Sequence, residues 1–267
     1  MSGFSGGSSS GPARSLLSTA RTYYVRSDGN DSNNGLSNAS GGAFATLQKA
    51  YDVIAATLDL GGNTVTISNG NAATFTSGIA ITQPWTGGGQ IVIDLGGGTI
   101  NSGAAGCLSN AITLPGLVTI QNGTLTTSAD GTLIANNGPG VIKVGASVTF
   151  GSAGISDHTS ARGAGASILF SANYTIAGGA RFHHLTQGPA QISATGLTVT
   201  VTGTPAFSSA FAGTQGGQVN VYSNTYSGSA TGVRYSADRL GLIDARGGAT
   251  YLPGGTAGTT SNGGLYV

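Results

Sequence analysis

The residues that could do acid–base chemistry gather between positions 130 and 184. Asp130 and Asp157 are 27 residues apart, and His158 and His183 are 25 residues apart. Histidine can act as a general base, and arginine can bind a carboxylate or sulfate through its planar guanidinium. The candidate catalytic residues are Asp130, Asp157, His158, Arg162, Arg181, His183 and His184. Such a set would suit the cleavage of an acidic glycan.

The case for catalysis from these residues has a clear competitor. Glycoside hydrolysis needs two carboxyl groups held roughly 5 to 9.5 Å apart. The chain has no glutamate, so its nine aspartates would have to supply both. Turn histidines and aspartates can instead stack on one another, cap turns or contact a neighbouring subunit. We therefore assign no catalytic residue with certainty, and both interpretations stay open.

A second group of candidates lies near the C-terminus and favours binding over chemistry. Tyrosine rings beside arginine can stack on sugar faces, although packing or a subunit interface is the more common use of such rings. The candidate glycan-binding residues are Tyr222, Tyr226, Arg234, Tyr235 and Tyr251.

The segment DGNDSNNG, residues 28–35, is a candidate cation site or a tight turn. An EF-hand loop that began at Asp28 would need glycine at its sixth position and glutamate at its twelfth. The chain has Asn33 and Ala39 there, so that pattern fails. Asp, Asn and Gly also suit turns through their backbone angles and local hydrogen bonds. A turn is the main interpretation, an irregular cation site from Asp28, Asn30 and Asp31 is the alternative, and we predict no cofactor.

Composition excludes several classes of protein. Of 267 residues only 7% are charged, the formal net charge is +1, and the basic residues are scattered. This charge pattern does not predict nucleic-acid binding. A single cysteine, Cys107, excludes an internal disulfide framework. The N-terminal residues have no apolar core of signal-peptide length, and no apolar run approaches the roughly 20 residues of a membrane helix.

The elements that would position these residues are short strands. Residues 46–60 have apolar side chains at helical spacing and end at two glycines, which predicts one amphipathic helix. Short runs of apolar residues, here called pulses, then recur at steps of 27, 24, 26, 24, 27 and 23 residues. Most of them are followed by a second pulse. The anchors are Ile91, Val118, Ile142, Ile168, Ile192, Val219 and Leu242. This period is typical of the coils of a parallel β-solenoid, although a β-sandwich is the alternative.

The predicted fold class is therefore all-β: a single-stranded, right-handed parallel β-helix with an N-terminal capping α-helix. Open ends of a solenoid need covering, because unpaired strand edges promote aggregation. We predict a flexible Gly/Ser-rich arm over residues 1–20, which is either an attachment peptide or a disordered tail. A first strand, a turn and the capping helix follow over 21–62, the coils over 63–252, and a C-terminal closing tail over 253–267.

The segment TYYVRSDGNDSNNGLSNASGGAFATLQKAYDVIA, residues 22–55, resembles the start of pectate-lyase-like right-handed β-helix proteins of phage and prophage tail spikes and tail fibres. The match includes Phe44 and residues 46–50. Later segments such as YTIAGGARFHH and VTVTGTPAFSSAFA look like those of phage adhesion proteins from alphaproteobacterial hosts. The resemblance covers roughly residues 21–267. It implies a homotrimer on a virion surface that contacts bacterial surface glycans.

These observations predict a virion-associated adhesin that binds bacterial polysaccharide without cutting it. It would be made in the host cytoplasm without a signal peptide and attached to other virion proteins through its N-terminal arm, with no nucleic-acid or membrane partner. One alternative is a polysaccharide depolymerase of capsule or lipopolysaccharide. Another is a structural particle component, such as a fibre shaft or head decoration.

Overall fold

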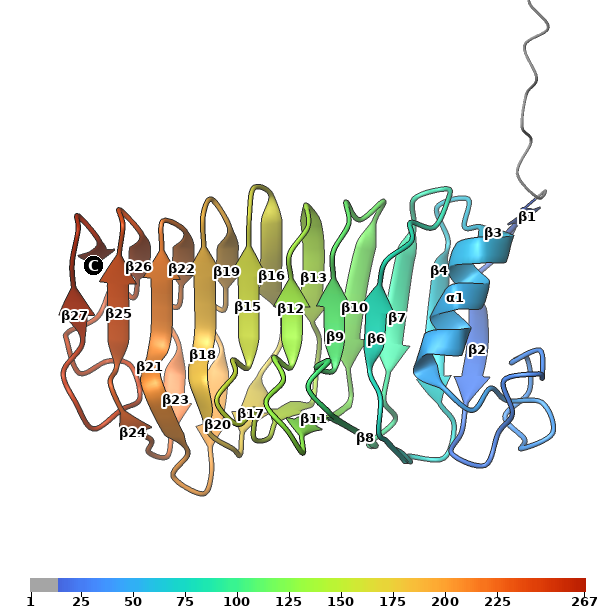
Figure 1. The fold of residues 1–267 in the computed structure, drawn as a ribbon, viewed down its shortest axis with the longest axis horizontal. Helices are drawn as coiled ribbons and strands as arrows, with labels where there is room; N and C mark the ends of the chain where they lie inside the picture. Colours follow the sequence, from blue (N-terminus) through green and yellow to red (C-terminus); the bar gives the residue numbers. More distant parts are fainter. Residues whose placement is uncertain (1–13) are drawn as a thin grey trace, which may run out of the picture.

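A computed structural model describes residues 14–267 of the chain (Figure 1). Three parallel sheets run along a single elongated body, and each complete coil passes from sheet 1 to sheet 2 to sheet 3. The expected fold class is confirmed, because the strands stack in parallel as a β-solenoid with a single helix in the described residues. The sequence had indicated at least two strands per coil, and the structure adds a third.

Each of the three sheets is a stack of short parallel strands. Sheet 1 contains β2 (Arg21–Val25), β4 (Thr64–Asn69), β7 (Gln90–Asp94), β10 (Leu117–Gln121), β13 (Gly140–Val144), β16 (Ala166–Phe170), β19 (Gln191–Ser193), β22 (Gln218–Asn220), β26 (Leu242–Asp244) and β28 (Leu265–Tyr266). Sheet 2 contains β5 (Thr74–Phe75), β8 (Thr99–Ser102), β11 (Gly123–Thr127), β14 (Val148–Phe150), β17 (Tyr174–Ile176), β20 (Thr198–Val201) and β23 (Thr225–Ser227). Sheet 3 contains β6 (Ile79–Ile81), β9 (Leu108–Asn110), β12 (Ile134–Asn136), β15 (Thr159–Arg162), β18 (Ala180–Gln187), β21 (Ala206–Gln215), β24 (Thr231–Gly232), β25 (Tyr235–Asp238) and β27 (Thr259–Thr260).

The core is a set of inward-facing columns that run through the coils. In sheet 1, Ile91 pairs with Val118, Val118 with Ile142, and Ile142 with Ile168, and all four side chains are buried. Because apolar side chains stack on apolar side chains of the next coil, the coils together bury a continuous apolar surface that no single coil could bury alone. The last predicted anchor is wrong by one residue: Val219 pairs with Ile243, and Leu242 pairs with Gln218.

The N-terminal end is covered by the helix and by a loop together. Helix α1 (Leu47–Thr57) begins after the N-cap Thr46, whose side chain accepts from Lys49 N, and it buries an apolar face. The outer edge of β2 is instead paired by the loop that precedes the helix, since Phe44 N donates to Tyr24 O and Arg26 N donates to Phe44 O. The helix therefore provides only part of the predicted cap.

Two predicted boundaries move. Within the expected arm, β1 (Ser15–Leu16) pairs with β3 (Leu58–Asp59) and Leu17 is buried, so the ordered body starts before residue 20. Residues 1–13 of that arm lie outside the described residues. Residues 253–267 are not a separate closing tail, because β27 pairs with β25 and β28 pairs with β26. They continue the solenoid by the same register that stacks the earlier coils.

Candidate functional site

The predicted catalytic constellation separates into an inner and an outer part. Position 158 stacks on position 183, as the 25-residue spacing indicated, because Thr159 pairs with His184 in sheet 3. His158, His183 and His184 are fully buried inside the coils. Asp130 is exposed, and Arg162 and Arg181 are partly exposed on the outside. The histidines therefore do not face a solvent-filled cleft together with the acids.

The three histidines belong to an aromatic cluster in the core. His158 Nδ1 lies 2.9 Å from His183 Nδ1, and the Tyr174 hydroxyl lies 3.0 Å from His183 Nε2. The rings of Phe150, Phe170, Phe207 and Phe211 pack against these imidazoles. Such a cluster supplies packing and internal hydrogen bonds.

Hydrogen bonding fixes the tautomer of His184. The Thr159 hydroxyl donates its only proton to the His183 carbonyl at 2.8 Å. The 2.9 Å contact between Thr159 Oγ1 and His184 Nδ1 must then be a bond that His184 donates. His184 Nε2 is left as a buried acceptor without a hydrogen-bond partner, and His158 Nε2 also lacks one.

Burial keeps these imidazoles neutral. Desolvation lowers the pKa of His158 to about 4, partly opposed by the nearby backbone of Gly151 and Gly179. Desolvation, together with the charge of His158, lowers the pKa of His184 to about 3. The pKa of His183 lies well below its usual value for the same first reason, with further contributions from both other histidines. A base that has no access to solvent and so low a pKa is poorly suited to general-base catalysis.

Asp157 forms an ion pair with arginine. Its side chain is fully buried, and Arg181 donates to both carboxylate oxygens, from Nε at 2.9 Å and from Nη2 at 2.8 Å. Arg162 Nη2 lies 3.7 Å from the same carboxylate. Hydrogen bonding to Asp157 raises the pKa of Arg181. This arrangement anchors the turn before β15 and does not expose a carboxylate to a substrate.

Asp130 and Asp157 are not brought together as an acid pair. The carboxylate of Asp130 instead accepts a hydrogen bond from the backbone of Ile155 at 2.9 Å, in the turn of the next coil. The 27-residue spacing exceeds the local repeat by two residues, because these two coils are in register at 25 residues, as the pairs Leu125–Phe150 and Ile134–Thr159 show. The sequence therefore predicted correctly that Asp130 contacts the coil that contains Asp157, but the contact is made with another residue of that coil.

The segment at residues 28–35 is built as a turn whose polar groups bind one another. Asp28 pairs with Arg26 at 2.8 Å, and Asn30 Oδ1 accepts from Ser32 N at 2.9 Å. Asp31 accepts from the backbone of Ala45 and Thr46 and from the Thr46 hydroxyl. Its carboxylate therefore holds the start of α1, where negative charge is favourable. These contacts favour the structural interpretation of the segment.

The candidate glycan-binding tyrosines have ring faces that are largely occupied. The guanidinium of Arg246 lies 3.9 Å from the ring centre of Tyr222, and Tyr235 stacks on Tyr266 at 3.8 Å. The Tyr251 hydroxyl donates to the backbone and accepts from Asn224 N. Open stacking platforms, as the sequence suggested, are therefore scarce among these residues.

Three of the five candidates nevertheless line one hollow. Tyr226, Arg234 and Tyr251 surround a pocket of about 270 Å³, together with residues 228–230 and 250–254. Arg234 Nε is buried without a hydrogen-bond partner. Within the described residues, Arg234 takes part in no salt bridge, unlike Arg239 and Arg246 nearby. This pocket is the predicted binding region that the structure assembles best.

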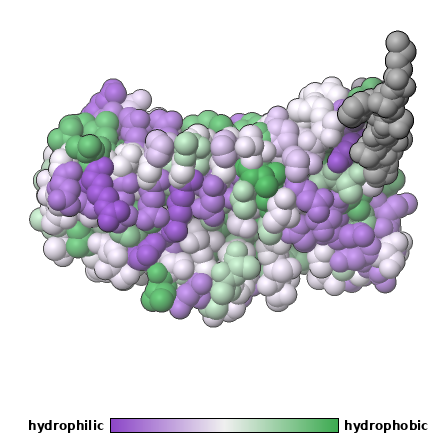
Figure 2. Space-filling view, turned by 45° about the horizontal axis from the view of Figure 1, so that its top comes forward, coloured by the Kyte–Doolittle hydropathy of each residue, from purple (hydrophilic) through white to green (hydrophobic). Residues whose placement is uncertain are grey.

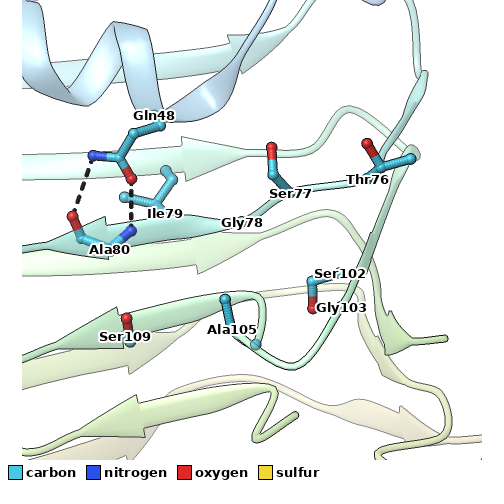
Figure 3. Close-up of a pocket in the computed structure, with 11 residues that line it drawn as sticks. Gln48, Thr76, Ser77, Gly78, Ile79, Ala80, Ser102, Gly103, Ala105 and Ser109 are labelled. Atoms are coloured by element: carbon cyan, nitrogen blue, oxygen red, sulfur yellow. Dashed lines mark hydrogen bonds between the residues drawn. The ribbon is translucent and has the colours of Figure 1, made fainter. Parts of the chain in front are cut away.

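A further hollow, of about 290 Å³, lies beside α1 (Figure 3). Its lining has no ionisable side chain: Gln48, Thr76, Ser77, Gly78, Ile79, Ala80, Ser102, Gly103, Ala105, Gly106 and Ser109. Both amide atoms of Gln48 are used by Ala80, since Nε2 donates to Ala80 O and Oε1 accepts from Ala80 N (Figure 3). Because Ala80 is in β6, the edge strand of sheet 3, Gln48 takes the place of a neighbouring strand.

A column of threonines on the outside of sheet 2 was not predicted from the sequence. Threonine is the middle residue of five second pulses, and four of these residues are Thr99, Thr124, Thr149 and Thr175. This recurrence was the available signal, but the pulses were used only to count strands. The registers place these four threonines side by side on consecutive coils.

Comparisons with known proteins give no match: no family model matches the chain, and no curated protein or solved structure reaches significant similarity. Within residues 14–267, no group of three or more His, Cys, Asp or Glu side chains is arranged to hold a metal ion. The helix in this part of the chain is too short and too polar to cross a membrane.

Proposed function

We propose that the protein is a non-catalytic adhesin of a phage or phage-like particle that binds bacterial surface polysaccharide. In this proposal it is a tail spike or tail fibre component, made without export and displayed on the virion. The N-terminal arm attaches it to other particle proteins, and the last coils contact the glycan. Repetition of weak sites over several subunits would raise the overall affinity.

The observation that carries the proposal is the pocket around Arg234. A guanidinium offers five donors in a planar fork that suits carboxylate or hydroxyl groups of sugars. Arg234 has an unpartnered Nε and lies beside Tyr226 and Tyr251, whose rings supply apolar walls. Small binding sites in proteins commonly combine such walls with a few polar groups.

Binding without cleavage is supported by the fate of the candidate catalytic groups. His158, His183 and His184 are buried, and the Asp157 carboxylate is bound by Arg181. The depolymerase alternative would need an acid and a base that reach one substrate. Asp130 alone among the predicted acids is exposed, with no second acid placed beside it by the register.

The test follows polysaccharide from a susceptible bacterium through size-exclusion chromatography with the purified full-length protein. We expect co-elution with the polymer at unchanged chain length. Arg234→Gln should weaken binding at least tenfold, whereas Arg239→Gln, at an exposed arginine outside the pocket, should leave it unchanged. Release of short fragments would contradict the proposal in favour of a depolymerase, and no co-elution would favour a purely structural particle component.

The oligomeric state is tested separately. We propose a homotrimer, on the basis of the resemblance and of the low charge of the chain. Analytical ultracentrifugation should give a mass near three times the 26.0 kDa of one chain. A monomer at micromolar concentration would contradict this part of the proposal.

A further inference from the structure

The outer face of sheet 2 carries one hydroxyl side chain per coil, in register over seven consecutive strands. Thr74 pairs with Thr99, Thr99 with Thr124, Thr124 with Thr149, Thr149 with Thr175, Thr175 with Thr200, and Thr200 with Ser227. We call these seven residues the hydroxyl ladder. Its strands run along the lower side of the molecule in Figure 1.

The ladder faces solvent. The next residue in each of the first six strands points into the core and is buried: Phe75, Ile100, Leu125, Phe150, Ile176 and Val201. Because side chains alternate across a strand, the hydroxyls point outward, and each ladder residue is partly or fully exposed. The hydroxyls of Thr126 and Thr127 on β11 bind backbone carbonyls. Within residues 14–267, those of the ladder remain available for a ligand.

Two hollows adjoin the middle of the ladder. Ser147 and Thr149 line both a groove of about 460 Å³, which extends over Asn122 and Thr124, and a groove of about 350 Å³, which extends over Thr175 and Thr200. The two grooves therefore share these two lining residues and lie one after the other along the ladder. A ligand along this path would meet a hydroxyl every 4.8 Å or so, and the six steps of the ladder span roughly 29 Å.

The face is uncharged. The row on one side of the ladder holds Gly97, Asn122, Ser147, Asn173, Thr198 and Thr225, and the row on the other side holds Thr76, Asn101, Thr126, Gly151, Ala177 and Thr202. The carboxylate of Asp94 lies at the border, where it accepts from Gln121 and Asn122. Charge complementarity across an interface thus favours a neutral partner, and the absence of basic residues in these rows argues against a nucleic acid.

We propose that the hydroxyl ladder binds a neutral, linear polysaccharide that lies parallel to the solenoid axis, with one sugar facing each coil. Each hydroxyl can both donate and accept a hydrogen bond, as sugar hydroxyls can. The threonine methyl groups contact the apolar faces of the rings. The rigid sheet holds the groups in place before binding, which lowers the entropic cost of association.

This inference rests on the proposed function for the class of ligand, but it assigns a different site from the Arg234 pocket. The two sites are complementary, since a polymer with a neutral backbone and an acidic or hydroxyl-rich branch would use both. Their failures can be separated by variants, because no ladder residue lines the Arg234 pocket.

The experiment uses affinity gel electrophoresis of the full-length protein in gels that contain soluble β-1,4-, mixed-linkage β- or α-1,6-linked neutral glucan or galactomannan. We expect at least one polymer to retard the protein, and its oligosaccharides to gain affinity up to a length that spans several coils. The triple variant Thr124→Val, Thr149→Val and Thr175→Val keeps the side-chain shape but removes the hydroxyls. It should lose at least tenfold in affinity.

The matched variant Thr124→Ser, Thr149→Ser and Thr175→Ser retains the hydroxyls and should stay within about threefold of the natural protein, a difference smaller than the 1.4 kcal/mol that tenfold represents. Retardation by no neutral polymer, or equal binding by the valine variant, would overturn the ladder proposal. If the valine variant instead changes the mass measured by sedimentation, the ladder face contacts a second copy of this chain and the proposal is wrong. Loss of host-polysaccharide binding in Arg234→Gln with the ladder variants unaffected would leave the proposed function standing alone.

Discussion

The histidine cluster inside the coils and the hydroxyl ladder outside sheet 2 use the same stacking rule with opposite results. Both place polar side chains on consecutive coils, with His158 beside His183 and Thr149 beside Thr175. Inside, most of the polar atoms bind one another, two imidazole nitrogens have no partner, and all are sealed from water. Outside, they form a repeating surface that stays accessible. A chemically reactive residue type is thus a weak guide to function in a solenoid unless the side of the sheet is known.

The sharpest way to break this comparison is to change two consecutive residues of β14. Phe150→Ala removes a buried ring that packs on His158 and His183, so it should cost about 3–5 kcal/mol of unfolding free energy. Thr149→Ala, one residue earlier and facing outward, should change stability by less than about 0.5 kcal/mol. Urea denaturation followed by circular dichroism measures both. Similar losses for the two variants would mean that the inside and outside are not distinguished as described.

A second test uses pH. The folded-state pKa values of the three histidines lie below the roughly 6.5 of an unfolded histidine, with His158 at about 4 and His184 at about 3. Below pH 6.5 the unfolded chain therefore binds more protons, and stability falls as pH decreases toward 4. The groups that face the cluster are Tyr174, Thr159 and phenylalanine rings, none of which offers a compensating negative charge.

The free energy of unfolding should decrease between pH 7 and pH 5, by at most about 1.4 kcal/mol per pH unit for each histidine. The variant His184→Phe keeps an aromatic ring beside Phe170 and Phe211 and should reduce the slope by roughly a third. A stability that does not change between pH 7 and pH 5 would contradict neutral, buried imidazoles.

The smallest expected effect compares two ion pairs. Asp157→Asn weakens the buried pair with Arg181 and should cost about 1–2 kcal/mol, at the modest end because Arg181 is 39% exposed. Asp28→Asn weakens the surface pair with Arg26 and should have no measurable effect on thermal unfolding. If the surface change were the larger, the turn at residues 28–35 would matter more to the fold than the turn before β15.

The fold could be predicted because a parallel solenoid repeats its register in the sequence. The anchors from Ile91 to Val219 align as the apolar spacing indicated, because each occupies the same inward position. The error at Leu242 arose where two apolar residues are adjacent and spacing alone does not say which one faces inward. The third strand of each coil was missed because strands such as Leu108–Asn110 and Ile134–Asn136 mix apolar residues with asparagine.

The site was harder to predict because residue spacing gives the coil on which a side chain lies but not the side of the sheet to which it points. The spacing placed His158 on His183 correctly, yet it did not reveal that both point inward. It also suggested a contact between Asp130 and Asp157, which a shift of two residues prevents. The tyrosines near the C-terminus were correctly located in the last coils, but their partners, such as Arg246 over Tyr222, come from residues on other coils.

The contact between Gln48 and Ala80 affects how the number of coils in such a molecule can change. Its single amide side chain satisfies the backbone of Ala80 at the first edge of sheet 3, a task that would otherwise need another strand. This contact joins α1 to β6 and involves none of the later coils. Whole coils can therefore be gained or lost behind it during evolution while the same start of the molecule is reused.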